Sequence, residues 1–131
     1  NFGVLFSCVM ADHIELGKLG EEKACEYLLS KGFRIIARNW RFRQKEVDVI
    51  AYDGNVLVVV EVRTRTSSKW EHPRESITPA KIRFLVLAAD AFVQQNRIDN
   101  RIRFDVVSCM PINETKWDID HIPHAFTAQA E

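Results

Sequence analysis

The pattern of apolar and polar residues along this chain predicts two helices and four or five strands. From Asp12 to Gly32 the apolar residues recur at helical spacing, with Asp12-x-x-Glu15 as a capping signal and Gly32 as a left-handed end. A second helix is predicted to open at Thr78-Pro79, because proline suits a first helical turn. Strand patterns cover residues 33–40, 46–52, 56–63 and 103–110, with a short edge strand over 117–122.

The connections between these elements predict a mixed sheet in one α/β domain. The first three strands follow one another closely and are expected to pair antiparallel, whereas the fourth follows a helical crossover, which favours parallel pairing. Asp53-Gly54, between the second and third strands, is typical of a two-residue hairpin loop. That loop would pair Asp48 with Val59. Asp48 and Glu61 would then be diagonal neighbours on one face, about 7 to 8 Å apart at the backbone.

Glu61 is a charged residue within an otherwise apolar strand, and a buried carboxylate is costly unless it is paired or bound to a metal. Two explanations stay open. Arg63 and Arg65 lie two and four residues further on, so either could form a structural ion pair on the same face. Asp48 on the neighbouring strand would instead crowd two carboxylates together, which favours a divalent cation such as Mg²⁺.

The order of these residues resembles a nuclease signature. An acidic residue on one strand, followed by Glu61-Val62-Arg63 on the next, is similar to the motif of the PD-(D/E)xK nuclease superfamily. Further segments extend the likeness over residues 14–107. They are Gly17-Lys18-Leu19-Gly20-Glu21-Glu22-Lys23-Ala24, Tyr27-Leu28, Asn39-Trp40-Arg41, Glu46-Val47-Asp48-Val49-Ile50 and Ile77-Thr78-Pro79-Ala80-Lys81. Together they resemble the YraN, or UPF0102, family, which is similar to archaeal Holliday junction resolvases.

This resemblance implies a restriction-endonuclease-like fold, with a mixed central sheet, an N-terminal helix, three antiparallel strands, a crossover helix and a further strand. It also implies that Asp48 and Glu61 bind Mg²⁺ or Mn²⁺, and that Glu21 is an additional acidic residue of the catalytic site. Arg63 stands where the signature usually has lysine. Because arginine stays charged, it can clamp a phosphate but cannot act as a base, so water activation would depend on the metal.

The net charge alone does not favour a nucleic-acid partner, since 18 basic and 18 acidic residues cancel. Their distribution does, because residues 31–103 contain 15 Lys or Arg against 8 Asp or Glu, an excess that can form a basic face. Lys81, in the first turn of a helix, is a phosphate-binding and catalytic candidate, with simple surface exposure as the alternative. Residues 38–45 mix cations with aromatics, which suits either a nucleic-acid strand or a protected edge strand. The predicted nucleic-acid contacts are Arg41, Arg43, Gln44, Arg65, Lys69 and Lys81.

The remaining composition bears on the cellular setting. Three cysteines, an odd count without metal-ligand spacing, favour reduced thiols and a cytoplasmic protein. The apolar start of the chain is too short to span a bilayer, so no membrane association is expected. Met10 is a candidate natural start. A single domain is therefore expected over residues 11–131, with residues 1–10 upstream of it.

These observations predict a metal-dependent endonuclease that hydrolyses nucleic-acid phosphodiesters. The resolvase resemblance favours DNA over RNA, selection by nucleic-acid structure, and a homodimer. The alternative is a binding module that keeps the nuclease fold without cutting, for which Arg63 is the main support. In a third interpretation Asp48, Glu61 and Arg63 form only a buried ionic network.

Overall fold

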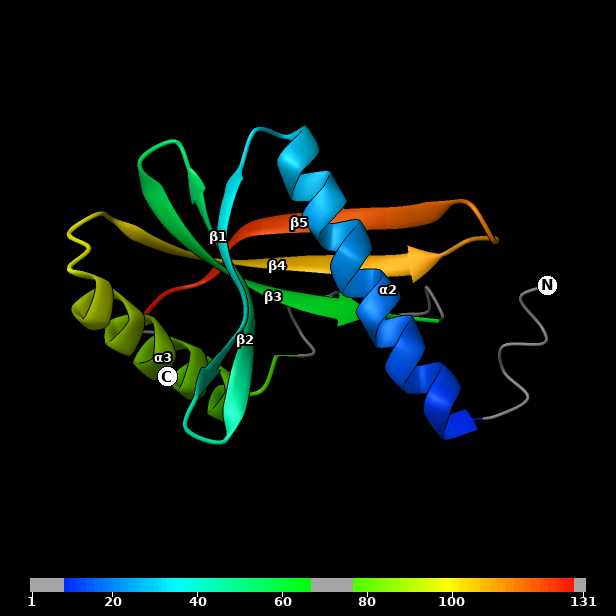
Figure 1. Cartoon of the computed structure of the whole chain (residues 1–131), viewed down its shortest axis with the longest axis horizontal. Coiled ribbons are helices and arrows are strands. Elements are labelled where there is room, and N and C mark those ends of the chain that lie inside the picture. The colour runs from blue at the N-terminus through cyan, green and yellow to red at the C-terminus, as the bar shows by residue number, and fades with distance from the viewer. Residues whose placement is uncertain (1–8, 67–76, 129–131) are drawn as a thin grey trace.

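Two helices pack on opposite faces of a five-stranded sheet in the computed structural model, which describes residues 9–66 and 77–128 (Figure 1). The elements are α2 (Val9–Ser30), β1 (Arg34–Phe42), β2 (Lys45–Asp53), β3 (Val56–Thr64), α3 (Pro79–Asn96), β4 (Ile102–Pro111) and β5 (Trp117–Phe126). The predicted α/β class and element order are confirmed. Within the described residues, neither helix is long and apolar enough to cross a membrane.

The strand order is β1-β2-β3-β4-β5. Strands β1, β2 and β3 pair antiparallel, β3 and β4 pair parallel across the α3 crossover, and β5 returns antiparallel to β4. The parallel pairing expected from the crossover is therefore confirmed. Two predicted element boundaries were wrong: α2 begins at Val9, before the proposed Asp12 cap, and β5, although it is an edge strand as expected, extends over 10 residues to Phe126.

The predicted hairpin loop was wrong by one residue. Asp53 pairs with Val56, so the loop residues are Gly54 and Asn55. Within this loop only Gly54 has a positive φ, at 62°, as in a turn that needs glycine in its first position. An Asp53-Gly54 loop would have required a positive φ at Asp53, whereas the observed loop gives this conformation to glycine, which has no Cβ. Asp53 instead stays in β2, where its Oδ2 lies 3.0 Å from Nη1 of Arg103.

The shifted loop changes the register of β2 against β3 by two residues, which preserves the face of every side chain. Alternation along β3 then divides the core between the helices. Val58 and Val60 pack with α2, whereas Leu57 and Val59 pack with α3. Pairing of β2 with β3 ends at Val49 and Val60, although both strands continue beyond that point. The two strands therefore part within the sheet.

Candidate active site

Asp48 and Glu61 come together where β2 and β3 part. The register of the last pair would, if continued, set Asp48 directly opposite Glu61. In place of that pairing, the Asp48 carboxylate accepts a hydrogen bond from the Val62 backbone N–H, with Oδ2 and N 2.8 Å apart. The Asp48 side chain thus takes the place of a backbone carbonyl of β2 as the acceptor for the Val62 N–H. This bond keeps Asp48 beside Glu61 although the two strands no longer pair here.

Glu61 is buried, with 4% of its surface exposed, and is incompletely satisfied. Its Oε1 has no hydrogen-bond partner in the described part of the chain, and the nearest cation is the Lys81 Nζ at 3.6 Å. Its Oε2 lies 3.5 Å from Nη1 of Arg63. Both separations exceed the 2.7 to 2.9 Å of a good charge-assisted hydrogen bond. The Glu61 carboxylate can therefore accept a further ligand. The predicted pairing of Glu61 with Arg63 is present, but it leaves Oε1 open.

Burial raises the pKa of both carboxyl groups. The pKa of Asp48 rises to about 7, first because the group is buried and then because the charge of Glu61 is close; the Val62 N–H and Lys81 oppose the rise. Burial also raises the pKa of Glu61, against the opposing charges of Lys81 and Arg63. The charges of Lys81 and Arg63 therefore do not fully offset the burial of these two acids, and a divalent cation would supply further positive charge.

Glu21 approaches this pair from α2. Burial, followed by the charge of Asp48, raises the pKa of Glu21, and a hydrogen bond from the Asn39 side chain lowers it. Asn39 lies in the middle of β1 with φ at 51°, a conformation that asparagine tolerates better than most residues. Sequence reasoning placed Glu21 correctly near the acids but missed Asn39, for which the Asn39-Trp40-Arg41 segment was the available signal.

The close approach of α2 depends on Gly20. A Cβ at this position would collide with the Thr64 hydroxyl at the end of β3, and the Gly20 carbonyl accepts a hydrogen bond from the Cys109 thiol at 3.4 Å. Glycine therefore lets the helix backbone lie directly on the sheet, one residue before Glu21. The helix is held here only a few residues along β3 from Glu61.

The structure records other contacts for the remaining predicted site residues that it describes. Arg41 forms an ion pair with Glu46, with Nη1 and Oε2 3.7 Å apart. Arg43 and Gln44 form the exposed turn between β1 and β2. The backbone N–H of Arg65 donates to the Cys109 carbonyl, and Lys69 lies outside the described residues. The acid site is therefore built from Asp48, Glu61, Arg63 and Lys81, with Glu21 beside them.

The donor set suits a hard, oxygen-seeking ion. No group of three or more His, Cys, Asp or Glu side chains able to hold a metal occurs among residues 9–66 and 77–128. Two carboxylates are nevertheless sufficient for Mg²⁺, which usually keeps several waters and uses one or two protein carboxylates. The unsatisfied Oε1 of Glu61 supports the fit, because it is a buried acceptor in need of a positive partner.

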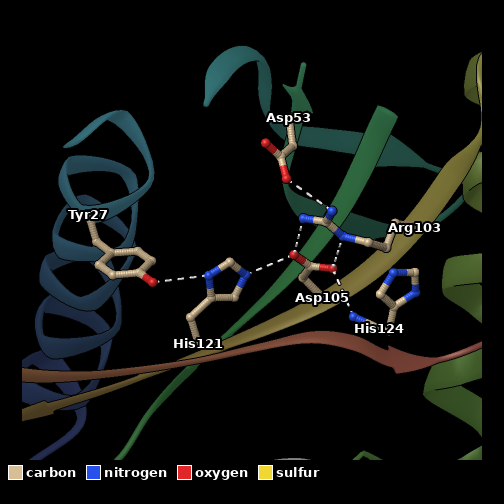
Figure 2. A network of polar contacts seen from close by, with 6 residues as sticks. All are labelled: Tyr27, Asp53, Arg103, Asp105, His121 and His124. Atoms are coloured by element: carbon tan, nitrogen blue, oxygen red, sulfur yellow. Dashed lines mark hydrogen bonds and ion pairs between the residues drawn. The ribbon is translucent and has the colours of Figure 1, made fainter. Parts of the chain in front are cut away.

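A second polar network, which sequence reasoning missed, surrounds Asp105 on the α2 side of the sheet (Figure 2). Arg103 donates to both carboxylate oxygens of Asp105, at 2.8 and 2.9 Å, and the backbone N–H of His124 donates to Oδ1 at 3.2 Å. His121 links the network to α2, with Nε2 2.8 Å from Asp105 and Nδ1 3.1 Å from the Tyr27 hydroxyl. An aspartate within the apolar run of β4 was the available signal.

The mixed sheet between an N-terminal helix and a crossover helix is the restriction-endonuclease-like fold, here with two acids on adjoining strands. The model of the "Uncharacterised protein family UPF0102" matches residues 20–109. UPF0102 proteins of Flavobacterium psychrophilum, Bacteroides thetaiotaomicron and Caldicellulosiruptor saccharolyticus are 41%, 43% and 46% identical over 117, 117 and 114 residues. These alignments cover 89%, 89% and 86% of this chain and 98%, 96% and 97% of the relatives. The chain belongs to the UPF0102 family.

Proposed function

We propose that this protein is a metal-dependent endonuclease that hydrolyses nucleic-acid phosphodiesters at Asp48 and Glu61. The observation that carries the proposal is the buried Glu61 carboxylate, whose Oε1 lacks a hydrogen bond within the described residues at the place where β2 and β3 part. A purely structural carboxylate in such a position would be expected to have its acceptors filled. The likeness to resolvases supports DNA as the substrate, and it supports a homodimer.

Asp48 and Glu61 would hold the Mg²⁺ or Mn²⁺ ion. Such an ion, when bound, lowers the pKa of water and offsets charge on the phosphate. The hydrogen bond from Val62 fixes one oxygen of Asp48 and so orients the carboxylate in advance. Preorganised ligands of this kind need less rearrangement when an ion arrives.

Arg63 and Lys81 would bind the scissile phosphate. Both already lie beside Glu61, at 3.5 and 3.6 Å, and both keep about a third of their side-chain surface exposed, at 35% and 28%. A cation on the Glu61 carboxylate would compete for that charge, so these two side chains could turn toward a phosphate. Glu21 would hold a water molecule near Asp48, since an acid with a raised pKa accepts protons closer to neutral pH.

A binding module without cleavage is the second candidate function. It is favoured by the ion pairs of Glu61 with Arg63 and Lys81, which partly neutralise the acid without a metal. Arginine at position 63 also removes the lysine that could lose a proton in the reaction. This candidate predicts salt-dependent binding that does not require a divalent ion.

Cleavage assays separate the two candidates. Branched, flapped and linear DNA and single-stranded RNA would be incubated with Mg²⁺, Mn²⁺ or EDTA and the wild-type, Asp48→Asn or Glu61→Gln protein. We expect divalent-dependent cleavage that falls about 100-fold or more in both variants, the size of effect typical for a lost transition-state contact. Asp118→Asn, an exposed change on β5, is the matched control and should cut like wild type. Equal cleavage by Glu61→Gln would exclude this site.

Ion binding can be measured without any substrate. Mn²⁺ at about 100 times its dissociation constant should raise the free energy of unfolding by about 2.7 kcal/mol, because it binds only the folded protein. The increase should disappear in Glu61→Gln and persist in Asp118→Asn. Salt-sensitive DNA binding with no response to Mn²⁺ would favour the binding module.

A further inference from the structure

Cations rest on aromatic rings where the β1–β2 turn meets the start of α3. The Arg43 guanidinium lies 4.8 Å from the centre of the Phe42 ring. Lys45 and Lys81 both lie over Phe84, with their Nζ atoms 5.8 and 5.7 Å from its ring centre. The Phe42 and Phe84 rings are themselves 6.0 Å apart. We call these five residues the turn–helix surface.

Two cations of this surface are available to a partner. Arg43 and Lys45 are exposed, and neither forms an ion pair with a carboxylate in the described part of the chain. Arg41, from the same turn region, is by contrast occupied by Glu46. The backbone of Arg43 has φ at 60°, a conformation that non-glycine residues adopt rarely and mostly where the surroundings fix it.

The turn–helix surface is continuous with the acid site through Lys81. The Nζ of this lysine lies 3.6 Å from Oε1 of Glu61 and, on its other side, 5.7 Å from the Phe84 ring centre. A nucleic-acid strand whose phosphate reaches Lys81 would therefore meet Phe84 and Lys45 next. Phe42 and Phe84 are half-buried, so each ring is anchored in the core and still reaches the surface.

We propose that the turn–helix surface binds an unpaired, single-stranded segment of nucleic acid next to the phosphodiester held at Asp48 and Glu61. This inference rests on the proposed function and names its substrate class. Cations alone would attract duplex and single strands alike, because both carry phosphate charge. Aromatic rings among those cations favour unpaired bases, which can leave their own stack and displace a cation from a ring. Bases inside a duplex are already stacked and paired.

Binding in EDTA tests this inference without requiring cleavage. A labelled oligonucleotide of about 16 nucleotides would be compared with the duplex of the same sequence, with wild type and with Phe84→Leu or Phe42→Leu. We expect each variant to bind the single strand about tenfold more weakly, the loss that one stacked base represents, and to bind the duplex almost unchanged. Lys45→Gln should weaken both forms and reduce the salt slope by about one.

Tyr52→Leu is the matched control, because Arg34 lies over that ring at 4.9 Å, away from the acid site. It should not change single-strand affinity. Two different phenylalanine variants guard against a folding defect in either one, which circular dichroism would reveal. Equal losses for single strand and duplex, or no preference of wild type for the single strand, would overturn the inference.

The inference and the proposed function fail separately. Divalent-dependent cleavage without single-strand preference would leave the endonuclease intact and remove the turn–helix surface as a strand-binding site. Single-strand binding that the phenylalanine variants weaken, with no cleavage under any ion, would leave the surface intact and remove the endonuclease.

Discussion

Two buried carboxylate centres lie in the same sheet, and their surroundings differ. Asp105 is fully buried, at 0% exposure, and accepts from Arg103, His121 and the His124 backbone at 2.8 to 3.2 Å (Figure 2). Glu61 is almost as buried, at 4%, yet its nearest cations lie at 3.5 and 3.6 Å and one oxygen lacks a hydrogen bond within the described residues. Burial is similar at the two centres, whereas hydrogen bonding is not.

The pKa values follow the same division. Burial would raise the pKa of Asp105, but hydrogen bonds from His121 and Arg103 outweigh it and lower the pKa. At the other centre burial wins, and the pKa values of Asp48 and Glu61 rise. A carboxylate whose acceptors are filled stabilises the fold, while one with an open acceptor has room for a ligand. This contrast supports a structural role for Asp105 and the ligand-binding role that we propose for Asp48 and Glu61.

The largest expected loss of stability follows from a substitution of Asp105. Asp105→Asn would remove the buried carboxylate that pairs with Arg103, and Arg103, which is mostly buried, would keep its ion pair with the more exposed Asp53 at 3.0 Å. Breaking a buried pair in this way costs about 3 to 5 kcal/mol. Urea unfolding at neutral pH should show this loss. Asp118→Asn, an exposed change on neighbouring β5, should alter the free energy of unfolding by less than about 0.5 kcal/mol. A loss below about 1 kcal/mol in Asp105→Asn would contradict the structural role.

Asp48→Asn should raise the free energy of unfolding of the metal-free protein above about pH 7, whereas Asp105→Asn lowers it. The folded-state pKa of Asp48 is about 7, above its value of about 3.9 in the unfolded chain, so the folded state binds the extra proton between these values. The stability of wild type therefore falls as pH rises through this window. Asparagine removes that dependence, so the free energy of unfolding of the variant relative to wild type should be roughly 4 kcal/mol more favourable near pH 8 than at pH 4.

Urea unfolding in EDTA across that pH range measures the gain. Asp105 supplies the comparison, because its lowered pKa contributes stability that is present above about pH 4 and is lost as pH falls further. A difference between Asp48→Asn and wild type that stays constant with pH would show that Asp48 ionises normally, and the contrast between the two centres would then weaken.

Much of the acid site was predictable because it depends on local patterns. Strand alternation has a period of two, so the two-residue error in register left the faces of the paired residues unchanged, and Asp48 still meets the Val62 backbone beside Glu61. The order of strands and helices, including the parallel crossover, likewise follows from spacing along the chain. Family resemblance, more than pattern, indicated Glu21.

The Asp105 network was not predictable in the same way. Its link between Tyr27 and His121 joins residues 94 positions apart, and no periodic pattern relates them. A tolerated positive φ at Asn39 and the close approach at Gly20 also depend on tertiary packing that a single sequence does not display. These features decide how near α2 comes to the two acids.

Gly20→Ala tests how strongly the acid site depends on that approach. Alanine usually stabilises a helix relative to glycine, by about 1 kcal/mol, but here its Cβ would meet Thr64 and force α2 away, for a net cost of about 1 to 3 kcal/mol. Gly17→Ala is the control, because nothing lies within 4 Å of its added Cβ. Thermal unfolding should therefore move in opposite directions for the two variants. Stabilisation by both would mean that Thr64 gives way at little cost.

The smallest expected loss of stability follows from removal of the Tyr27 hydroxyl, which contacts His121 of the Asp105 network. Tyr27→Phe removes the hydroxyl that lies 3.1 Å from Nδ1 of His121 and should lower the free energy of unfolding by about 0.5 to 1.5 kcal/mol. Tyr52→Phe, whose hydroxyl has no hydrogen bond among the described residues, should change it little.

The Mn²⁺ affinity of Tyr27→Phe tests whether the two carboxylate centres are independent. If the two carboxylate centres are independent, Tyr27→Phe should weaken α2 and leave Mn²⁺ affinity at wild-type level, since Asp48 and Glu61 keep all their contacts. Hydrogen exchange of the α2 amides would show the loosening directly. A matching loss of Mn²⁺ affinity would instead mean that the Asp105 network, acting through α2 and Glu21, sets the geometry of the acid site.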